Sequence, residues 1–332
     1  MAARPIAVLG AGSWGTALAL VVAWNGIPVR LWGHSAEHIA ALQHSRCNEQ
    51  HLPGAPFPEL LTATASLSGA MDGVRDTMIV VPSHAFRTLV EHLVDLVKPD
   101  SRIAWATKGL EAESGGLLHQ VVEARLPGHP TAVLSGPSFA REVAANLPTA
   151  VTIASRNRQF AVELAATFHG DQFRPYTSDD IIGVELGGAV KNVLAVATGI
   201  ADGLGLGANT RAGLITRGLA EVVRLGASMG AESRTFMGLS GVGDLILTCT
   251  DDQSRNRRLG LALGRGQSLE QAVAEIGQTV ESVRTAGEVH ALAATQGVEM
   301  PICEQVHAVV NEGRTPGDAL DQLMARSRKS EF

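Results

Sequence analysis

Residues 5–23, PIAVLGAGSWGTALALVVA, join a short apolar run, a glycine-rich turn and a helical apolar segment without interruption. The run from Pro5 to Leu9 suits a buried parallel strand, and residues 10–15 read GxGxxG. A strand, a tight turn and a helix start in this order are what a dinucleotide pyrophosphate requires. The pattern predicts a Rossmann-like domain that binds a dinucleotide through Gly10, Gly12 and Gly15, with a simple glycine-rich turn as the weaker alternative.

The loop after the second expected strand, Val29 to Trp32, indicates which coenzyme is bound. NAD-specific sites usually carry an acidic residue here for the ribose hydroxyls, whereas this loop reads Gly33-His34-Ser35. His34 and Ser35 can donate hydrogen bonds to a 2′-phosphate. We therefore expect NADP(H), with NAD also accepted because Glu37 follows closely.

Further expected strands end in loops with polar residues. Because the carboxyl ends of parallel strands open on one crevice, these loops should converge with the glycine-rich turn and His34. Lys108 could equally be a solvated loop charge, and Gly136-Pro137 only a turn. The strands and the loops that follow them are Thr77–Val81 with Pro82-Ser83, Arg102–Ala106 with Thr107-Lys108-Gly109, and Thr131–Leu134 with Ser135 to Ala140, including Ser138.

Strand signals fade near Ser178, and helical patterns dominate the rest of the 332 residues. A chain of this length suits two domains. We expect an α/β fold: an N-terminal doubly wound, Rossmann-like sheet over residues 1–180, followed by an all-helical substrate-binding and catalytic domain over residues 181–328. The first helix of the second domain should lie next to the crevice of the first.

That helix lies in residues 183–207, GVELGGAVKNVLAVATGIADGLGLG, with Lys191 in its middle. Helical side chains lean toward the N-terminus, so Lys191 should lie over Gly187 and Gly188. Adjacent glycines weaken a helix, which indicates that a backbone or a ligand comes close at this point. The apolar neighbours predict a partly desolvated ammonium with a lowered pKa, suited to proton transfer. A lysine that snorkels from a helix edge is the alternative, and the polar residues and glycines argue against a membrane span.

A second dense patch of polar residues follows the glycine-rich segment GLSGVG at residues 238–243. Asp244 comes directly after it and could orient the Lys191 ammonium and receive a hydrogen bond from a substrate. Ser254 is a predicted N-cap with Arg255 and Asn256 in the first helical turn. Free N–H groups, the positive end of the helix dipole and a guanidinium suit a phosphate there, while an ordinary capped helix with surface arginines is an equal alternative.

Charge and cysteine content exclude several other classes of protein. The net charge of -6 leaves no general basic surface for nucleic acid. The three cysteines are few and far apart, so we expect neither a disulfide framework nor a metal site. No targeting segment is expected, and a reducing cytoplasm fits this composition. A homodimer is left open.

Taken together, the motifs resemble the bacterial-type NAD(P)-dependent glycerol-3-phosphate dehydrogenases over nearly the whole chain. Valine is more usual in that family where Thr279 stands, and glycine where Ser282 stands, so the assignments around residues 279–281 depart from the pattern. The resemblance rests on GAGSWGTALA (10–19), VPSHAFR (81–87), TKGLE (107–111), SGPSFAREV (135–143), ELGGAVKNVLAVATGI (185–200), GLSGVGDLILTCT (238–250), SRNRRLG (254–260) and VESVRT (280–285).

The resemblance implies a fold like that of 6-phosphogluconate dehydrogenase and a specific reaction. NAD(P)H would reduce dihydroxyacetone phosphate to sn-glycerol 3-phosphate, which supplies phospholipid synthesis in the cytoplasm. Lys191 would exchange a proton with the C2 oxygen, as the catalytic proton acceptor of the oxidising direction. A 3-hydroxyacid dehydrogenase and a non-catalytic NADP-sensing module are the alternatives. The implied coenzyme contacts are Ser13, Trp14, His34, Lys108, Ala140, Arg255, Thr279 and Glu281; the implied substrate contacts are Lys108, Gly136, Ser138, Asp244, Ser254, Arg255 and Asn256.

Overall fold

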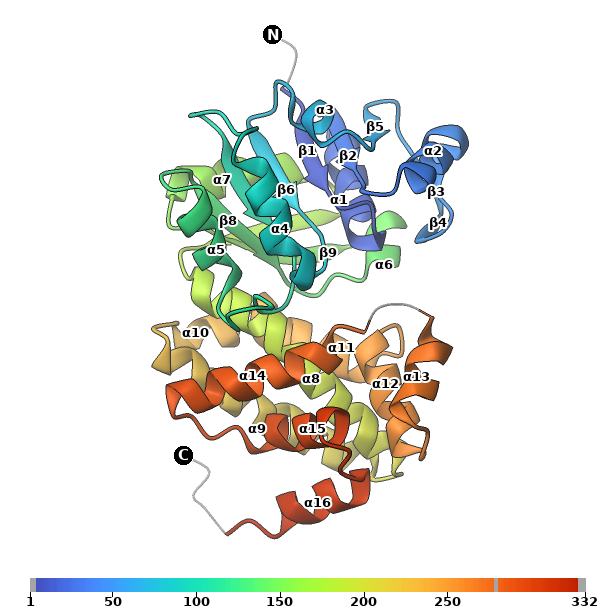
Figure 1. The fold of residues 1–332 in the computed structure, drawn as a ribbon, viewed down its shortest axis with the longest axis vertical. Coiled ribbons are helices and arrows are strands. Elements are labelled where there is room, and N and C mark those ends of the chain that lie inside the picture. The colour runs from blue at the N-terminus through green and yellow to red at the C-terminus, as the bar shows by residue number, and fades with distance from the viewer. Residues whose placement is uncertain (1–3, 278–279, 328–332) are drawn as a thin grey trace. The chain divides into compact units, whose positions relative to one another are not determined.

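The computed structural model describes residues 4–277 and 280–327, which divide into two compact units (Figure 1). The first comprises Met1–Ala112 with Gly116–Glu185, and the second Glu113–Gly115 with Leu186–Phe332. The division falls inside a long helix, α8 (Ile181–Gly203), because Ile181 and Val184 belong to an apolar core of the first unit. The boundary expected near residue 180 stays a prediction that differs from this division by less than two helical turns.

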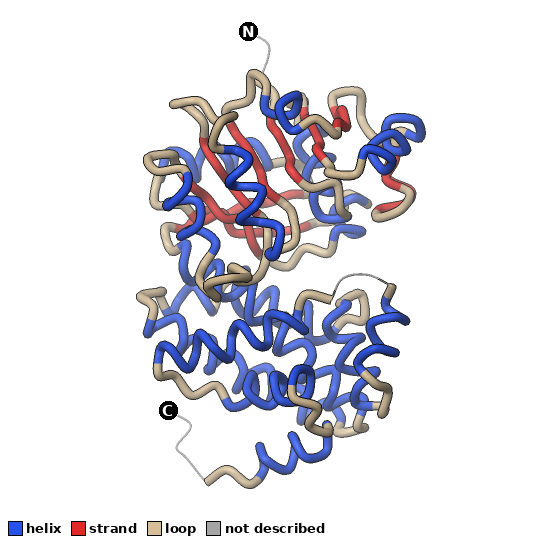
Figure 2. Tube along the Cα trace, in the orientation of Figure 1, coloured by secondary structure: helices blue, strands red, loops and turns tan. Residues whose placement is uncertain are grey.

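The first unit contains an eight-stranded sheet with the order β10-β9-β8-β7-β6-β1-β2-β5, and a separate two-stranded ribbon, β3-β4. Figure 2 shows the sheet strands in red with helices on either side. The strands are β1 Ile6–Leu9, β2 Val29–Trp32, β3 Cys47–Asn48, β4 Leu52–Pro56, β5 Leu61–Thr64, β6 Asp76–Ile79, β7 Arg102–Trp105, β8 Thr131–Ser135, β9 Thr149–Ala154 and β10 Phe173–Ser178; the helices are α1 Ser13–Trp24, α2 Ala36–Ser45, α3 Leu67–Met71, α4 Ser83–Leu93, α5 Leu118–Arg125, α6 Ala140–Ala144 and α7 Arg158–Phe168.

The direction of pairing changes once in this sheet. The strands from β5 to β8 are parallel, whereas β9 pairs with β8 in the antiparallel sense and β10 then follows β9 in parallel. An antiparallel neighbour needs no long crossover, which fits the single short helix α6 between β8 and β9. The loops after β1, β2, β7 and β8 therefore lie at one edge of the sheet, as the predicted doubly wound fold requires.

Burial on both faces of the sheet follows from the sequence of its strands. In β1, Ile6 and Val8 belong to one core, which includes residues of α1 and α7, while Ala7 and Leu9 belong to another, with residues of α4 and α5. Side chains alternate between faces along a strand, so a fully apolar strand needs helices on both sides. This arrangement gives the α/β architecture expected from the sequence.

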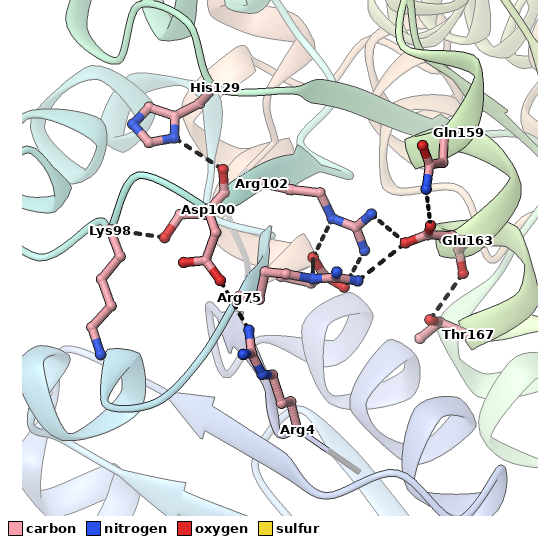
Figure 3. Close-up of polar contacts among 11 residues, drawn as sticks. Arg4, Arg75, Lys98, Asp100, Arg102, His129, Gln159, Glu163 and Thr167 are labelled. Carbon is pink, nitrogen blue, oxygen red and sulfur yellow. Dashed lines mark hydrogen bonds and ion pairs between the residues drawn. The ribbon is translucent and has the colours of Figure 1, made fainter.

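At the amino ends of β6 and β7, Arg102 holds a buried ion-pair cluster (Figure 3). Its guanidinium donates to both carboxylate oxygens of Asp76, at 2.6 and 2.7 Å, and to Glu163 of α7 at 2.5 Å. The guanidinium also lies 4.6 Å from the centre of the Phe160 ring. Because Asp76 and Arg102 begin their strands, the cluster ties α7 to the sheet edge opposite the loops described above.

The described residues of the second unit form helices joined by loops, with no strand among them, as predicted for the C-terminal domain (Figure 2). Its longest helix, α8, is apolar and long enough to cross a membrane. Of the 18-residue stretch of α8 that meets this description, however, 94% is buried within the protein. It is the core helix of the unit. The elements that follow are α9 Gly207–Ser228, α10 Ser233–Phe236, the π-helical turn η1 Leu239–Gly243, α11 Asp244–Thr250, α12 Arg255–Gly264, α13 Leu269–Ile276, α14 Ser282–Gln296, α15 Pro301–Asn311 and α16 Pro316–Met324.

Candidate active site

The glycine-rich turn between β1 and α1 has the geometry that binds a pyrophosphate. Gly10 has a φ of +131°, and a Cβ there would lie 2.4 Å from the Val80 carbonyl oxygen. A Cβ on Gly15 would lie 1.8 Å from the Gly10 carbonyl oxygen, so the turn and helix pack without side chains between them. A Cβ on Gly12, by contrast, would meet no atom within 4 Å. This open space at the start of α1 suits an anion, because the helix N-terminus is electropositive there.

Two further features of this turn fit a dinucleotide. Gly12 is the N-cap of α1, whose first residue is Ser13, and it offers no side chain that would occupy the free N–H groups. The indole nitrogen of Trp14 is buried and has no hydrogen-bond partner among the described residues. A buried donor without a partner is costly, which favours a ligand that accepts a bond from it.

The loop after β2 lies against the glycine-rich turn, as expected. A Cβ on Gly33 would approach the Ala11 Cβ to 3.0 Å, and the Gly10 N–H donates to the Trp32 carbonyl at 2.8 Å. Ser35 is the N-cap of α2 and accepts from the His38 N–H at 3.2 Å, while His34 is exposed. The residues predicted for the 2′-phosphate therefore lie beside those predicted for the pyrophosphate.

The loops after β7 and β8 also meet. The Lys108 ammonium donates to the Gly136 carbonyl at 3.2 Å, and the Ser138 hydroxyl donates to the same oxygen at 2.9 Å. Gly136 has a φ of +143°, and a Cβ there would lie 3.0 Å from the Val151 Cα, so this turn favours glycine. Three predicted substrate residues are thus brought together, with Ala140 at the start of the short helix α6.

Lys191 lies in the buried interior of the second unit. Its side chain is 9% exposed, and its ammonium donates to Asp244 at 2.5 Å and to the Thr248 hydroxyl at 2.8 Å. The alternative of a lysine that snorkels to solvent is therefore wrong. The carboxylate of Asp244, itself 1% exposed, offsets the cost of burying the ammonium and fixes its direction.

The close approach predicted at the glycines of α8 occurs at Gly187. A Cβ on Gly187 would lie 2.3 Å from the Ser240 carbonyl oxygen in η1. The π-helical turn η1 bends at Gly241, whose φ of -99° and ψ of -105° are not helical. A Cβ on Gly241 would lie 2.1 Å from the backbone of Phe236. This bend leads directly into α11, which begins with Asp244 beside Lys191.

The start of α12 is capped as predicted. The Ser254 hydroxyl accepts from the Arg257 N–H at 3.2 Å, and Arg255 is the first residue of the helix. The amide nitrogen of Asn256 donates to the side-chain oxygen of Asn192 at 2.9 Å, and Asn192 follows Lys191 in the chain. The Asn256 side-chain oxygen is buried and has no partner within the described ranges.

Two glycine pairs bring α12 against α8. A Cβ on Gly199 would lie 2.3 Å from the Arg257 carbonyl oxygen, and one on Gly260 would lie 2.2 Å from the Val196 carbonyl oxygen. Gly203 and Gly264 repeat this contact one turn further along both helices. The phosphate-binding candidates at the start of α12 are therefore held against the helix that carries Lys191.

Three further polar residues lie in this region without a role predicted from the sequence: Thr248, Asn192 and Arg257. Thr248 follows Asp244 by one helical turn, and that spacing places both on one face. Arg257 is buried and donates to Asp202 at 2.6 Å and to Asp252 at 2.9 Å. No sequence signal separates this structural arginine from its neighbours in SRNRR.

The remaining predicted coenzyme residues are less well defined by the structure. Glu281 is the N-cap of α14, while Thr279 lies outside the described residues.

Cys249 lies in α11, the helix that begins with Asp244. Burial raises the pKa of its thiol to about 12, so this cysteine stays protonated near neutral pH. A protonated thiol is a poor nucleophile, so Cys249 is not suited to covalent catalysis.

Comparison with known proteins gives one consistent result over the whole chain. The family model described as NAD-dependent glycerol-3-phosphate dehydrogenase N-terminus matches residues 5–161, and the C-terminus model of the same family matches residues 180–321. Glycerol-3-phosphate dehydrogenase (NAD(P)+) of Halorhodospira halophila is 58% identical over 99% of both chains. The enzyme of the same name from Thioalkalivibrio sulfidiphilus is 56% identical over 100% of both chains. The crystal structure of glycerol-3-phosphate dehydrogenase from Coxiella burnetii has a TM-score of 0.95 and 52% identity, covering 98% of this chain and 99% of that one.

The contact at Gly187 predicts opposite effects of the same substitution at two helical glycines. Gly187→Ala would place a methyl group against the Ser240 carbonyl, so the free energy of unfolding should fall by about 1–3 kcal/mol through overpacking. Gly213→Ala in α9 is the matched control, because a Cβ there meets nothing within 4 Å. It should raise the free energy of unfolding by about 0.5–1 kcal/mol. Urea unfolding followed by circular dichroism would measure both, and an unchanged or stabilised Gly187→Ala variant would contradict the close contact.

Proposed function

Because this chain belongs to the family of NAD(P)-dependent glycerol-3-phosphate dehydrogenases, we propose that Lys191 is its catalytic acid–base residue. The enzyme is an oxidoreductase that interconverts dihydroxyacetone phosphate and glycerol 3-phosphate with NAD(P) as coenzyme. The reaction takes place in the cytoplasm, and we propose from the family resemblance that its product supplies phospholipid synthesis. This assignment sets aside both the 3-hydroxyacid dehydrogenase and the non-catalytic sensing module.

The proposed role of Lys191 is supported by the buried contacts of its ammonium with Asp244 and Thr248. In the reducing direction the substrate carbonyl carbon, C2, gains a hydride and its oxygen gains a proton. The coenzyme, when bound, supplies that hydride. Lys191 donates the proton to the C2 oxygen and takes it back in the oxidising direction. Asp244 and Thr248 orient the ammonium through their bonds of 2.5 and 2.8 Å, so the proton donor is held before substrate arrives.

We propose that the substrate phosphate binds at the start of α12. The Ser254 hydroxyl accepts from the helix and keeps its own hydrogen to donate. Arg255 adds a positive charge at the electropositive helix end, which favours a dianionic group. The Asn256 amide is held by the side chain of Asn192, the residue that follows Lys191 in the chain. This bond links the proposed phosphate site to the part of α8 that carries Lys191. The other substrate contacts are proposed from the family resemblance, and they are Lys108, Gly136, Ser138 and Asp244.

The proposed coenzyme contacts divide into two groups. The pyrophosphate and the 2′-phosphate are assigned to the glycine-rich turn and the loop after β2, whose geometry fits such groups. The others rest on the family resemblance. The first group is Gly10, Gly12, Ser13, Trp14, Gly15 and His34; the second is Lys108, Ala140, Arg255, Thr279 and Glu281.

A homodimer remains a hypothesis for the assembly state. Analytical ultracentrifugation of the purified chain would support it by a sedimenting mass of two chains. A single-chain mass at micromolar concentration would contradict it.

Replacing Lys191 by alanine should remove most of the activity. General acid–base groups contribute typically 10²–10⁴-fold, so kcat for dihydroxyacetone phosphate should fall by about that factor. The dissociation constant of NADPH, measured by fluorescence titration, should stay within about threefold because no coenzyme group is expected at Lys191. Lys98→Ala, at an exposed lysine, is the matched control. Turnover near that of the wild type in a folded Lys191→Ala variant would exclude the proton-transfer role.

The coenzyme loop predicts that NADPH serves at least as well as NADH. No carboxylate stands at Gly33-His34-Ser35 to repel a 2′-phosphate, and His34→Asp should reverse the preference. His44→Asp, at an exposed position near the end of α2, controls for the added charge. Values of kcat/KM for both coenzymes test this. A wild-type preference for NADH of about tenfold or more would show that the loop does not select the coenzyme.

Arg255→Ala should weaken use of the phosphorylated substrate. Charge-assisted bonds contribute about 1.5–3 kcal/mol, so kcat/KM for dihydroxyacetone phosphate should fall by about 10- to 100-fold. The variant should also lose most of its preference over unphosphorylated dihydroxyacetone. Arg258→Ala, at an exposed neighbour, is the control. An intact preference would move the phosphate elsewhere, and a loss confined to NADPH affinity would assign Arg255 to the coenzyme.

A further inference from the structure

The geometry points to Asn48 as a positioning residue for the glycine-rich turn that binds the coenzyme, a role that rests on the coenzyme site proposed above. Asn48 lies in the ribbon strand β3, outside the main sheet, and its side chain is fully buried. A register shift between Cys47 and Asn48 interrupts the pairing of β3 with β4. Such irregularities often re-aim a side chain, and here the amide lies beside the turn and α1.

Every hydrogen-bonding position of the Asn48 amide is occupied. Its nitrogen donates to the Ala11 carbonyl at 2.9 Å and to the Thr16 hydroxyl at 2.8 Å. Its oxygen accepts from the His51 N–H at 3.2 Å and from the His38 ring at 3.1 Å. An asparagine side chain offers two donors and two acceptor lone pairs, so this buried amide is fully satisfied.

The contacts also determine the orientation of the amide. The Ala11 carbonyl can only accept, so the amide nitrogen, and not the oxygen, must face the turn. The oxygen then faces α2, and His38 must carry a hydrogen on Nε2 in order to donate to it. Asn48 cannot be replaced by aspartate without placing an acceptor against the Ala11 carbonyl.

The bond to Ala11 adds a side-chain contact to the main-chain bond from the Gly10 N–H to the Trp32 carbonyl, which holds the other side of the turn. Ala11 stands between Gly10 and Gly12, and glycines lose more conformational freedom on folding than any other residue. A turn already ordered before the coenzyme binds avoids that entropy cost at the moment of binding. The bond to Thr16 fixes the first turn of α1 to the same amide, so both parts of the pyrophosphate site share one anchor.

A purely structural role would be shared by another side-chain amide that bonds at the other end of α1, the partly buried Asn25. Asn25, the C-cap of α1, donates to the Thr167 carbonyl at 2.9 Å. It therefore ties the opposite end of α1 to the body of the first unit, far along the helix from the glycine-rich turn. Removing the Asn25 amide should cost stability without disturbing the coenzyme site, which makes it the matched control.

The test is coenzyme affinity in the absence of substrate, measured by fluorescence titration with NADPH and with NADH. Asn48→Leu is neutral and similar in size, and it should raise both dissociation constants by about tenfold, since more than one hydrogen bond is lost. Thr16→Val removes a single acceptor and should raise both by about threefold, which covers the case of a misfolded Asn48→Leu. Asn25→Leu should leave both within about twofold, and kcat at saturating coenzyme should change little in all three.

Three outcomes would overturn the inference. They are unchanged affinity in folded Asn48→Leu and Thr16→Val variants, an equal loss in the Asn25→Leu control, and a loss confined to NADPH, which would assign Asn48 to α2 and the 2′-phosphate instead. Failure of the unmodified protein to bind either coenzyme would instead contradict the proposed coenzyme site. Circular dichroism and thermal unfolding of each variant establish that the proteins compared are folded.

Discussion

Contact between backbones at the glycines of α8 is the constraint on which the helical half of this enzyme depends. Gly187 lies against the Ser240 carbonyl, and Gly199 lies against the Arg257 carbonyl further along the same helix. Side chains at these points would push η1 and α12 away from α8, because a Cβ would come within 2.3 Å of each carbonyl oxygen. The relative positions of Lys191, Asp244 and the start of α12 are therefore set by main-chain contacts, which vary less than side-chain packing.

Several buried charges in this protein form ion pairs, and the position of each pair indicates its purpose. Arg102 with Asp76 lies at the amino ends of the strands and joins a helix to the sheet. Arg257 with Asp202 and Asp252 holds the segment that leads into Ser254. The pair of Lys191 with Asp244 differs because it lies beside a π-helical turn and a second polar residue, Thr248. Burying charges is expensive, so a pair retained where apolar packing would serve suggests a chemical role.

In the first unit, the glycine-rich turn is also held in place by contacts with other segments, but these include a side-chain amide as well as main-chain atoms. A glycine-rich turn that binds a pyrophosphate, as proposed here, must leave space for that group, so it cannot be held by its own side chains. Contacts from outside hold it instead: the Val80 main chain against Gly10 and the Asn48 amide on Ala11. The antiparallel turn from β8 to β9 places Gly136 at the same edge of the sheet, where Lys108 and Ser138 share its carbonyl. An open binding surface is thus combined with a constrained backbone.

The sequence by itself determined the fold class, the glycine-rich turn, the capped helix at Ser254 and the functional candidates Lys191 and Asp244. These features depend on local patterns: the order of strand, turn and helix, the alternation of apolar residues, and capping chemistry. The sequence predicts the contact of Asp244 with Lys191 as a possibility, and the tertiary structure confirms it. Only the tertiary structure decided that Thr248 also meets Lys191, that Arg257 is structural, and that Asn48 reaches the glycine-rich turn. Those contacts join residues distant in sequence, such as Asn48 and Ala11 or Lys191 and Asp244. Local patterns can nominate the members of such a pair, but the packing of whole elements determines which distant side chains come within hydrogen-bonding distance.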